Sequence, residues 1–254
     1  LLHTTLVSGE WVNQTIEPMP ECGGMLAAAI DGQDRIHLVW YKFTMLDKAT
    51  LSQVIYGLYD GEWSFSQVHA GSRLLRELRL ALDNADEPWV AFVEEVGAEN
   101  ENNTIHLCAK NGSAWDDLTI DDYSGPSFLD LEIDSSGRPN LLLLDPFSYE
   151  IALKIRDNGQ WLHESVAQLE QRTYVIALAL DGTDRPHVVF TDREDSQVDS
   201  RLYYALDIDQ QWVSSLIDPA RLGYEAELSW TSAGELYALY SVDTELKIGR
   251  RVEQ

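Results

Sequence analysis

Six charged side chains occupy positions of a repeated strand where sister copies of that strand carry small residues. One sister copy has Ala27 and Ala29 at these positions, and another has Ala177 and Ala179. Polar groups at such positions are costly unless they are paired, hydrated or coordinated. The six candidates for ligand binding are Glu77, Arg79, Asp130, Glu132, Glu225 and Glu227.

Several carboxylates that face one channel suit two kinds of chemistry. They can bind a cation, or raise one another's pKa for acid–base catalysis. Glycoside hydrolysis needs two carboxylates about 5–10 Å apart across a sugar. A structural interpretation stays open beside these, in which Arg79 neutralises Asp130 or Glu132 on the adjacent blade and water fills the remaining space. We therefore assign no catalytic residue and no metal ligand. We expect no cofactor, although a divalent cation such as calcium could bind these carboxylates.

These residues are positioned by a repeat of about fifty residues with four short β-type segments. The clearest copy comprises residues 177–181, 185–190, 202–205 and 212–218. Such a repeat is typical of a propeller blade, and because a blade cannot bury both of its faces alone, the copies must stack into a ring. The first strand of each blade lies nearest the central axis, and this is the strand that carries the six candidates.

Two sets of residues mark the repeat. Aspartates end the first strand of four copies, and each is expected to accept a hydrogen bond from the backbone two residues on; Thr231 replaces the aspartate in the fifth copy. Tryptophans follow the tight turn between third and fourth strands and are expected to pack between blades. The aspartates are Asp31, Asp83, Asp134 and Asp181, and the tryptophans are Trp11, Trp63, Trp115, Trp161 and Trp212.

The repeat predicts an all-β fold, a five-bladed β-propeller of four-stranded antiparallel blades in a single domain of residues 1–254. The expected blades are approximately 21–70, 71–122, 123–168, 169–218, and 219–254 completed by 1–18. The N- and C-terminal strands would then share one blade, which removes exposed sheet edges. One segment is left over. Either residues 1–6 and 246–252 compete for one position, or the chain continues past residue 254; we favour the shared blade.

The charge of the chain excludes some partners. Asp and Glu total 43 against 18 Lys and Arg, which gives a net charge of −25. Such a surface repels phosphate backbones and anionic membranes, so we expect no nucleic-acid partner. No apolar run approaches the length needed to span a bilayer, so no membrane insertion is expected. Residues 94–104 and 191–200 are acidic connections that we expect on one rim as solvated loops.

The cysteines and histidines carry little functional signal. Cys22 and Cys108 lie at non-equivalent places of the repeat, so we expect buried free thiols rather than a disulfide. The six histidines show no spacing typical of metal ligands. His37 and His187 occupy equivalent repeat positions, which indicates a structural role.

The repeat resembles the secreted bacterial propeller proteins of the sialidase or Asp-box-like type. The resemblance is carried by Asp181 with Pro186-His187-Val188, by residues 202–205, and by the Gly-x-Trp turns. No copy contains the Asp-box sequence Ser-x-Asp-x-Gly-x-Thr-Trp. The resemblance implies the architecture and an extracellular or periplasmic location. Five-bladed relatives include sugar-binding lectins such as tachylectin and arabinanase-like glycoside hydrolases.

The expected function is recognition. The main interpretation is a non-catalytic, lectin-like module, monomeric, that binds a glycan, a protein or another ligand at the mouth of the channel. The alternative is a glycoside hydrolase-like enzyme that uses the channel carboxylates. A third interpretation is a structural interaction domain of a larger exported protein. Because a fold of this kind hosts many functions, the choice depends on the site.

Overall fold

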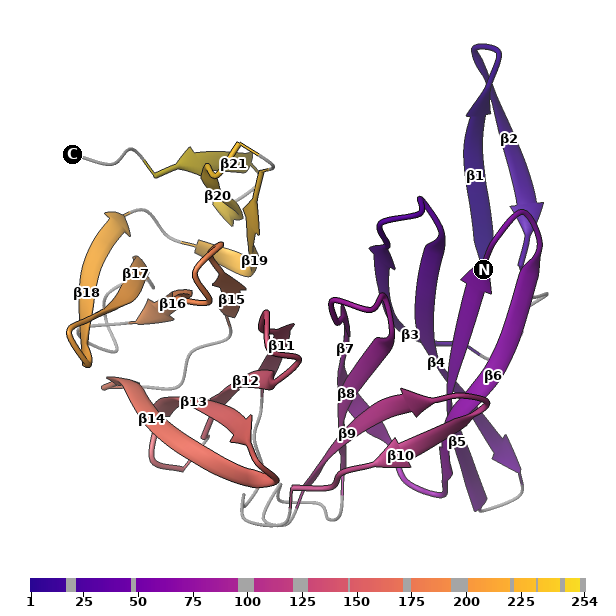
Figure 1. Cartoon of the computed structure of the whole chain (residues 1–254), viewed down its shortest axis with the longest axis horizontal. Helices are drawn as coiled ribbons and strands as arrows, with labels where there is room; N and C mark the ends of the chain where they lie inside the picture. Colours follow the sequence, from indigo (N-terminus) through magenta and orange to yellow (C-terminus); the bar gives the residue numbers. More distant parts are fainter. Residues whose placement is uncertain are drawn as a thin grey trace.

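The computed structural model describes residues 1–16, 22–46, 49–95, 103–120, 128–145, 147–170, 175–192, 201–219, 222–231, 233–242 and 245–251. All regular elements in these residues are β-strands, and they form six antiparallel sheets (Figure 1). The described residues contain no helix long and apolar enough to cross a membrane. That the chain forms a single domain stays a prediction.

Four of the sheets have four strands that follow one another in chain order. They are β3 (Cys22–Ile30), β4 (Ile36–Leu46), β5 (Ala49–Tyr59) and β6 (Trp63–Gly71); β7 (Leu75–Leu82), β8 (Pro88–Glu94), β9 (Thr104–Asn111) and β10 (Ala114–Asp117); β11 (Phe128–Ile133), β12 (Pro139–Leu144), β13 (Glu150–Asp157) and β14 (Gln160–Gln168); and β15 (Ile176–Leu180), β16 (Pro186–Asp192), β17 (Arg201–Ile208) and β18 (Gln211–Asp218). The remaining strands are the hairpin β1 (Leu2–Val7) and β2 (Glu10–Thr15), and the three-stranded sheet β19 (Leu222–Trp230), β20 (Leu236–Val242) and β21 (Glu245–Arg250).

The first strands of successive sheets lie side by side, as in a propeller. β3 contacts β7, β7 contacts β11, β11 contacts β15, and β15 contacts β19. These five strands lie on the inside of the arc in Figure 1, and the fourth strands β6, β14 and β18 lie on its outside. The inner strands therefore bring residues from distant parts of the sequence to one central space.

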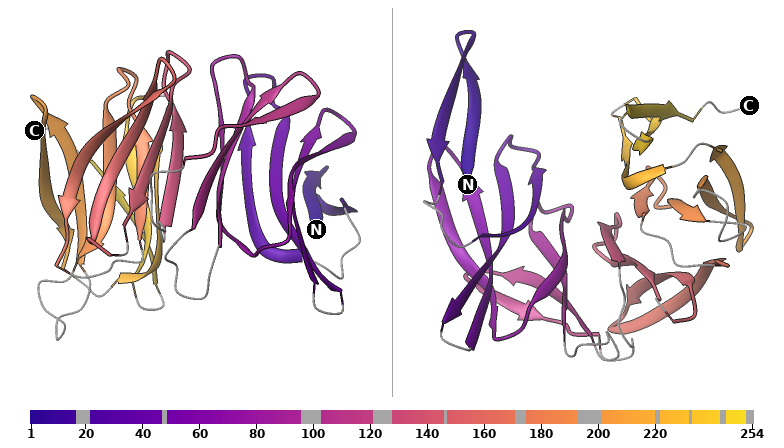
Figure 2. Two further views of the ribbon diagram at one scale, coloured as in Figure 1. Left: turned by 90° about the horizontal axis from the view of Figure 1, so that it is seen from below. Right: turned by 180° about the vertical axis from the view of Figure 1, so that it is seen from behind.

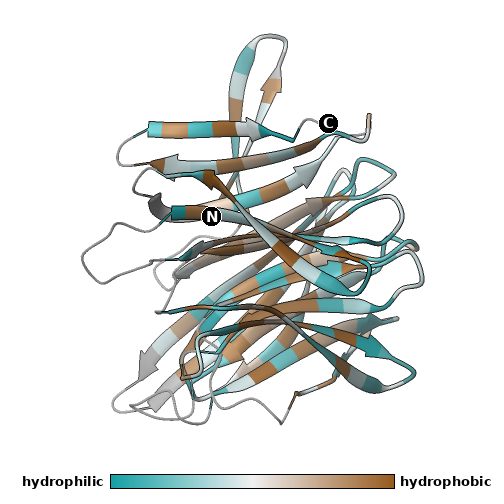
Figure 3. Cartoon of the chain, turned by 90° about the vertical axis from the view of Figure 1, so that its left-hand side faces the viewer, coloured by the Kyte–Doolittle hydropathy of each residue, from teal (hydrophilic) through white to brown (hydrophobic). Residues whose placement is uncertain are grey.

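The core consists of four apolar clusters, one between each pair of neighbouring sheets from β3–β6 to β19–β21. Figure 3 shows the apolar bands along the strands. Both faces of β15 are buried: Leu178 packs toward the third four-stranded sheet, and Ala177 and Ala179 pack toward the last sheet. The small residues expected to face the axis thus pack between sheets. The reason is that the two faces of an inner strand point to its two neighbouring sheets.

The predicted turn aspartates are confirmed. Asp31 accepts hydrogen bonds from the backbone N–H of Gln33 (2.8 Å) and of Arg35 (2.9 Å). Asp83, Asp134 and Asp181 each make the same pair of bonds to the second and fourth residues that follow. In all four turns the third residue after the aspartate has a positive φ, between 60° and 77°. The turn aspartates thus have a structural role.

The packing roles of the aromatic residues are also confirmed. Trp115 donates a hydrogen bond to Ser66 of the preceding sheet (3.2 Å), and Trp212 does the same to Glu164 (3.4 Å). Trp11 is the exception, with 70% of its surface exposed. His37 is held between Asp31 (3.0 Å) and the Tyr56 hydroxyl (2.8 Å). His187 bridges Asp181 and Tyr204 in the same way.

The predicted closure of the ring is wrong for the described residues. β1 pairs only with β2, and the C-terminal strands form a separate sheet. β21 pairs with β20 and so takes the edge expected for residues 1–6. The hairpin instead packs through His3 against Tyr59 and Trp63. The termini lie apart in Figure 1 and in both views of Figure 2. With six sheets, the count of five blades is not confirmed.

The remaining sequence expectations have mixed outcomes. Cys108 is a buried free thiol, as predicted. The side chain of Cys22 lies outside the described residues. So do residues 96–102 and 193–200, which make up most of the two acidic connections.

Candidate functional site

A chain of polar contacts crosses three inner strands. Arg79 on β7 lies 3.5 Å from the Glu77 carboxylate and 3.3 Å from the Asp130 carboxylate on β11. Asp130 also accepts hydrogen bonds from the backbone N–H of Leu131 (3.0 Å) and of Leu178 on β15 (2.8 Å). The structural interpretation is therefore confirmed in part, because Arg79 pairs with Asp130.

The start of β7 is bent where these residues lie. The register with β8 shifts between Arg76 and Arg79, so that the strand has a bulge there. Glu77 lies inside the bulge with φ at 51°, a value uncommon for a residue other than glycine. A bulge redirects side chains, and bulges are frequent next to active sites. This bend brings the Glu77 carboxylate to the Arg79 guanidinium, which also pairs with Asp130.

Burial and charge act against each other on the two paired acids. Burial raises the pKa of Asp130, while the Arg79 guanidinium and the two backbone N–H groups lower it; the net direction is upward. The pKa of Glu77 is likewise raised by burial against the opposing charges of Arg79 and Arg76. Arg79 thus compensates only part of the cost of burying two carboxylates.

Glu132 has a different environment from the other acids. It lies two residues beyond Asp130 on β11, so both side chains project from the same face of the strand. Among the described residues it has no hydrogen bond and no salt bridge. Burial, followed by the negative charges of Asp130 and Glu227, raises the pKa of Glu132 to about 8. The Glu132 carboxyl is therefore protonated at neutral pH.

The structure places four of the six candidates close enough to one another for salt bridges or for an effect on pKa. A fifth candidate acts on this group from another strand. Glu77, Arg79, Asp130 and Glu132 come from β7 and β11. Glu227 is an exposed residue of β19, and its charge acts on Glu132 across the central space. The side chain of Glu225 lies outside the described residues.

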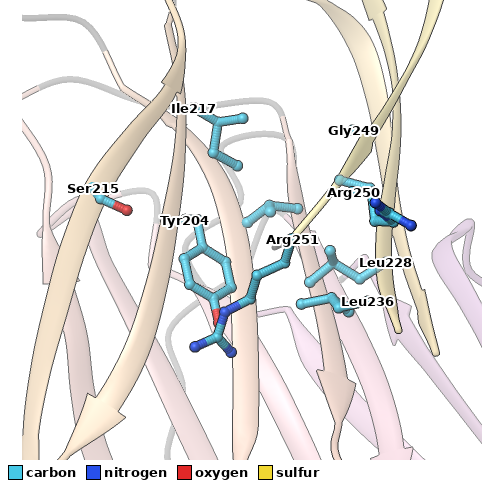
Figure 4. A pocket seen from close by; sticks show the side chains of 10 residues that line it. Tyr204, Ser215, Ile217, Leu228, Leu236, Gly249, Arg250 and Arg251 are labelled. Atoms are coloured by element: carbon cyan, nitrogen blue, oxygen red, sulfur yellow. The ribbon is translucent and has the colours of Figure 1, made fainter. Parts of the chain in front are cut away.

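A separate pocket lies between β17–β18 and the last sheet (Figure 4). It has a volume of about 160 Å³ and a largely apolar lining that includes Leu228 and Leu236. Arg251 and Tyr204 also line this pocket, and the Arg251 guanidinium lies 5.5 Å from the centre of the Tyr204 ring. None of the six candidates lines this pocket. Sequence reasoning did not single it out, because its lining combines residues of β16, β17 and β18 with residues of the last sheet, and these share no motif.

The whole fold is similar to that of solved glycosidases. The α-L-arabinanase of Penicillium chrysogenum superposes with a TM-score of 0.60 at 11% identity, covering 90% of this chain and 77% of that one. The endo-arabinase of Bacteroides thetaiotaomicron gives 0.56 at 9% identity, covering 90% and 94%. The GH93 α-L-arabinofuranosidase of Fusarium graminearum gives 0.56 at 11% identity, covering 88% and 76%. The sequence matches no family model and no curated protein.

These likenesses correct two expectations. At such low identity they show the fold alone, a propeller-type arrangement of β-sheets. The resemblance to the sialidase or Asp-box type is not confirmed. The main functional prediction, a non-catalytic recognition module, is contradicted, because the similar structures are glycoside hydrolases, as its alternative expected.

Proposed function

We propose that this chain is a glycoside hydrolase-like enzyme and that Glu132 is its general acid. One observation carries the proposal: a carboxyl on an inner strand, with no hydrogen-bond partner among the described residues, has its pKa raised to about 8. A general acid must hold a proton at the pH at which the enzyme works. In glycosidases that proton goes to the oxygen of the scissile bond.

The neighbouring acids take distinct roles in this proposal. Glu227 is exposed on β19, and in this proposal it acts as base toward water or as nucleophile. Asp130 is held by Arg79 and two backbone N–H groups, so it is a positioning residue whose charge keeps the proton on Glu132. Their combined negative charge also stabilises the positive charge that develops on the sugar ring.

The substrate class follows from the names of the similar structures. An arabinanase and an arabinofuranosidase among them were solved with arabinobiose. Arabinose-containing oligosaccharides and polysaccharides are therefore the first substrates to test. The monomeric state and the extracellular or periplasmic location stay predictions.

The test is hydrolysis by the purified protein on a panel of aryl α-L-arabinofuranosides, arabinan and other plant glycans. We expect turnover on at least one member, and a loss of roughly 10²–10⁴-fold in kcat for Glu132→Gln. The matched control is Glu150→Gln, which changes a partly buried carboxylate of β13 that bonds His163. No turnover on any glycan, or an active Glu132→Gln variant with unchanged kcat, would overturn the proposal.

A further inference from the structure

Two histidines from neighbouring sheets meet at the ends of their strands. His69 lies on β6 of the first four-stranded sheet, and His106 lies on β9 of the next. Their ring centres are 4.9 Å apart. Phe92 of β8 lies against both, stacked on His106 at 4.8 Å and 5.0 Å from His69. This apolar ring fixes the two imidazoles in place beside each other.

Two carboxylates complete the cluster. Asp117 of β10 lies 2.7 Å from Nδ1 of His106 and accepts a second hydrogen bond from the Thr119 hydroxyl (3.0 Å). Because Asp117 is an acceptor, the neutral form of His106 that bonds it carries its proton on Nδ1 and leaves a lone pair on Nε2. Glu94, the last residue of β8, lies 3.9 Å from Nε2 of His69 and 3.7 Å from Nε2 of His106. Both distances are too long for hydrogen bonds.

The two Nε2 atoms therefore lack a partner. Both are buried, and neither makes a hydrogen bond within the described part of the chain. His106 is only 8% exposed. A buried polar atom left without a partner is costly, and each such atom in a native protein calls for an explanation. A cation between the rings is a partner that both nitrogens could share.

Gly71 lies directly against two of the proposed ligand atoms. A Cβ added to Gly71 would lie 3.0 Å from Nε2 of His69 and 3.0 Å from Oε1 of Glu94. The φ of Gly71 does not lie in the left-handed region, so the backbone does not require glycine there. A side chain at this position would instead force the His69 and Glu94 ligand atoms to move.

We propose that His69, His106 and Glu94 bind a divalent transition-metal ion of the Zn²⁺ type, and that Asp117 orients His106. Imidazole and carboxylate ligands suit such ions. Neighbouring ligand atoms around a tetrahedral zinc ion lie about 3.3 Å apart, so small side-chain rotations close the distances to Glu94. A carboxylate that holds the far nitrogen of a metal-binding histidine is a recurrent feature of zinc sites.

The site would join two sheets. His69 belongs to the outer strand of one sheet, whereas Glu94 and His106 belong to the two middle strands of the next. Arg73 lies 3.8 Å from Glu94 and is half exposed, so it can swing into solvent when a cation takes its place. Three protein ligands leave a fourth position for water. No motif indicates this site in the sequence, because the ligands come from three separate strands.

The test is metal binding by the chelator-treated full chain, measured by calorimetry with Zn²⁺ and by the visible absorption of bound Co²⁺. We expect one ion per chain with four-coordinate Co²⁺, and loss of binding in His69→Gln and His106→Gln. Asp117→Asn should weaken binding by about 10–100-fold. The matched control is His163→Gln. Like His69, His163 lies on the fourth strand of its sheet and faces a glutamate, here Glu150 at 3.3 Å.

Gly71→Ala decides the matter if the histidine variants do not fold. It changes no ligand but displaces the ligand atoms of His69 and Glu94, so it should abolish Zn²⁺ binding while the metal-free protein unfolds at nearly the same temperature. The proposal would be overturned if Gly71→Ala and Asp117→Asn both bound Zn²⁺ with the affinity of the wild type. It would also be overturned if the wild-type chain bound no Zn²⁺. None of these readouts depends on glycan hydrolysis, so this site and the proposed enzyme fail independently.

Discussion

The turn aspartates and the channel acid Glu132 are carboxyl groups placed in opposite environments. Burial opposes the ionisation of Asp31, yet hydrogen bonds from His37, Arg35 and Gln33 outweigh it and hold the pKa well below its usual range. At Asp181, burial is likewise outweighed, by Thr183, Arg185 and His187, and the pKa falls to about 2. Glu132 has burial and two negative neighbours, and its pKa rises to about 8.

This difference distinguishes carboxyl groups that stabilise the fold from a carboxyl group suited to proton transfer. A turn aspartate sits where the backbone supplies two N–H groups, so the fold itself stabilises its charge. The same arrangement recurs in four sheets, which indicates a requirement of the blade. Glu132 has no equivalent arrangement, so its charge is disfavoured and its proton is retained. A carboxyl kept neutral at pH 7 is unfavourable for stability and useful for proton transfer.

The sharpest test of this contrast is the pH dependence of stability in Glu132→Gln. The folded pKa of Glu132 is raised from 4.5 to about 8, so its contribution is complete below pH 4.5 and is lost as the pH rises through 8. Gln cannot ionise. We therefore expect equal free energies of unfolding at pH 4, and a variant more stable by roughly 3–5 kcal/mol at pH 9. Urea titrations between pH 4 and 9 measure this. Parallel curves would show that Glu132 is not a neutral acid in the fold.

A second test removes the positive charge of Arg79, which pairs with Asp130 and Glu77. In Arg79→Met, Asp130 and Glu77 lose their shared positive charge, so we expect a loss of about 2–3 kcal/mol at pH 7. The loss should be smaller at pH 5 than at pH 7, because burial raises the pKa of both acids and neutralising them by protonation becomes easier as the pH falls. Arg138→Met is the matched control: Arg138 contacts Asp134 at 2.7 Å and is exposed to a similar degree. Asp134 lies among N–H donors without a second buried acid, so its loss should be about 1 kcal/mol at both pH values. Equal, pH-independent losses would contradict the contrast.

The local features of this fold were predictable from sequence, and the long-range ones were not. The aspartate turns and the tryptophan contacts recur at a fixed period, so each copy supports the interpretation of the others. The closure failed because it depends on whether residues 1–6 or β21 pairs with β20, and both are suitable strands. No local pattern distinguishes two such partners.

The candidate site was predictable to the same extent. Strand alternation and comparison between copies singled out Arg79, Asp130 and Glu132, which lie close together; that they form a functional site stays a prediction. The role of the face was misjudged, because the alternate face of an inner strand packs against the next sheet, as Ala177 does. The neighbours of His69 could not be predicted from the sequence, because they depend on which strand ends meet across two sheets.

A third test concerns the turn aspartates. Asp181→Asn keeps the shape of the side chain and removes the charge that Thr183 and Arg185 stabilise. The folded pKa of Asp181 is lowered from 3.8 to about 2, so its contribution is present above pH 3.8 and is lost as the pH falls through 2. We expect a loss of about 1 kcal/mol at pH 7, limited by solvent screening, and almost none at pH 2. Thermal unfolding at the two pH values measures it, and an undiminished loss at pH 2 would argue against the role of the charge.

The smallest effect should come from restoring the aspartate that the last sheet lacks. Thr231 receives one hydrogen bond on its hydroxyl, from the N–H of Glu235 (3.1 Å), where the turn aspartates receive two backbone bonds. The backbone bonds of this turn match those of the other copies, from Thr231 to Glu235 and from Gly234 to Thr231. Asp at this position can therefore accept the second N–H without a change of the backbone. We expect Thr231→Asp to stabilise the protein by about 0.5–1 kcal/mol at pH 7, and Thr231→Asn by less. If Asp and Asn stabilise equally, the geometry of the turn matters more than the charge, and the contrast with Glu132 then lies in hydrogen bonding alone.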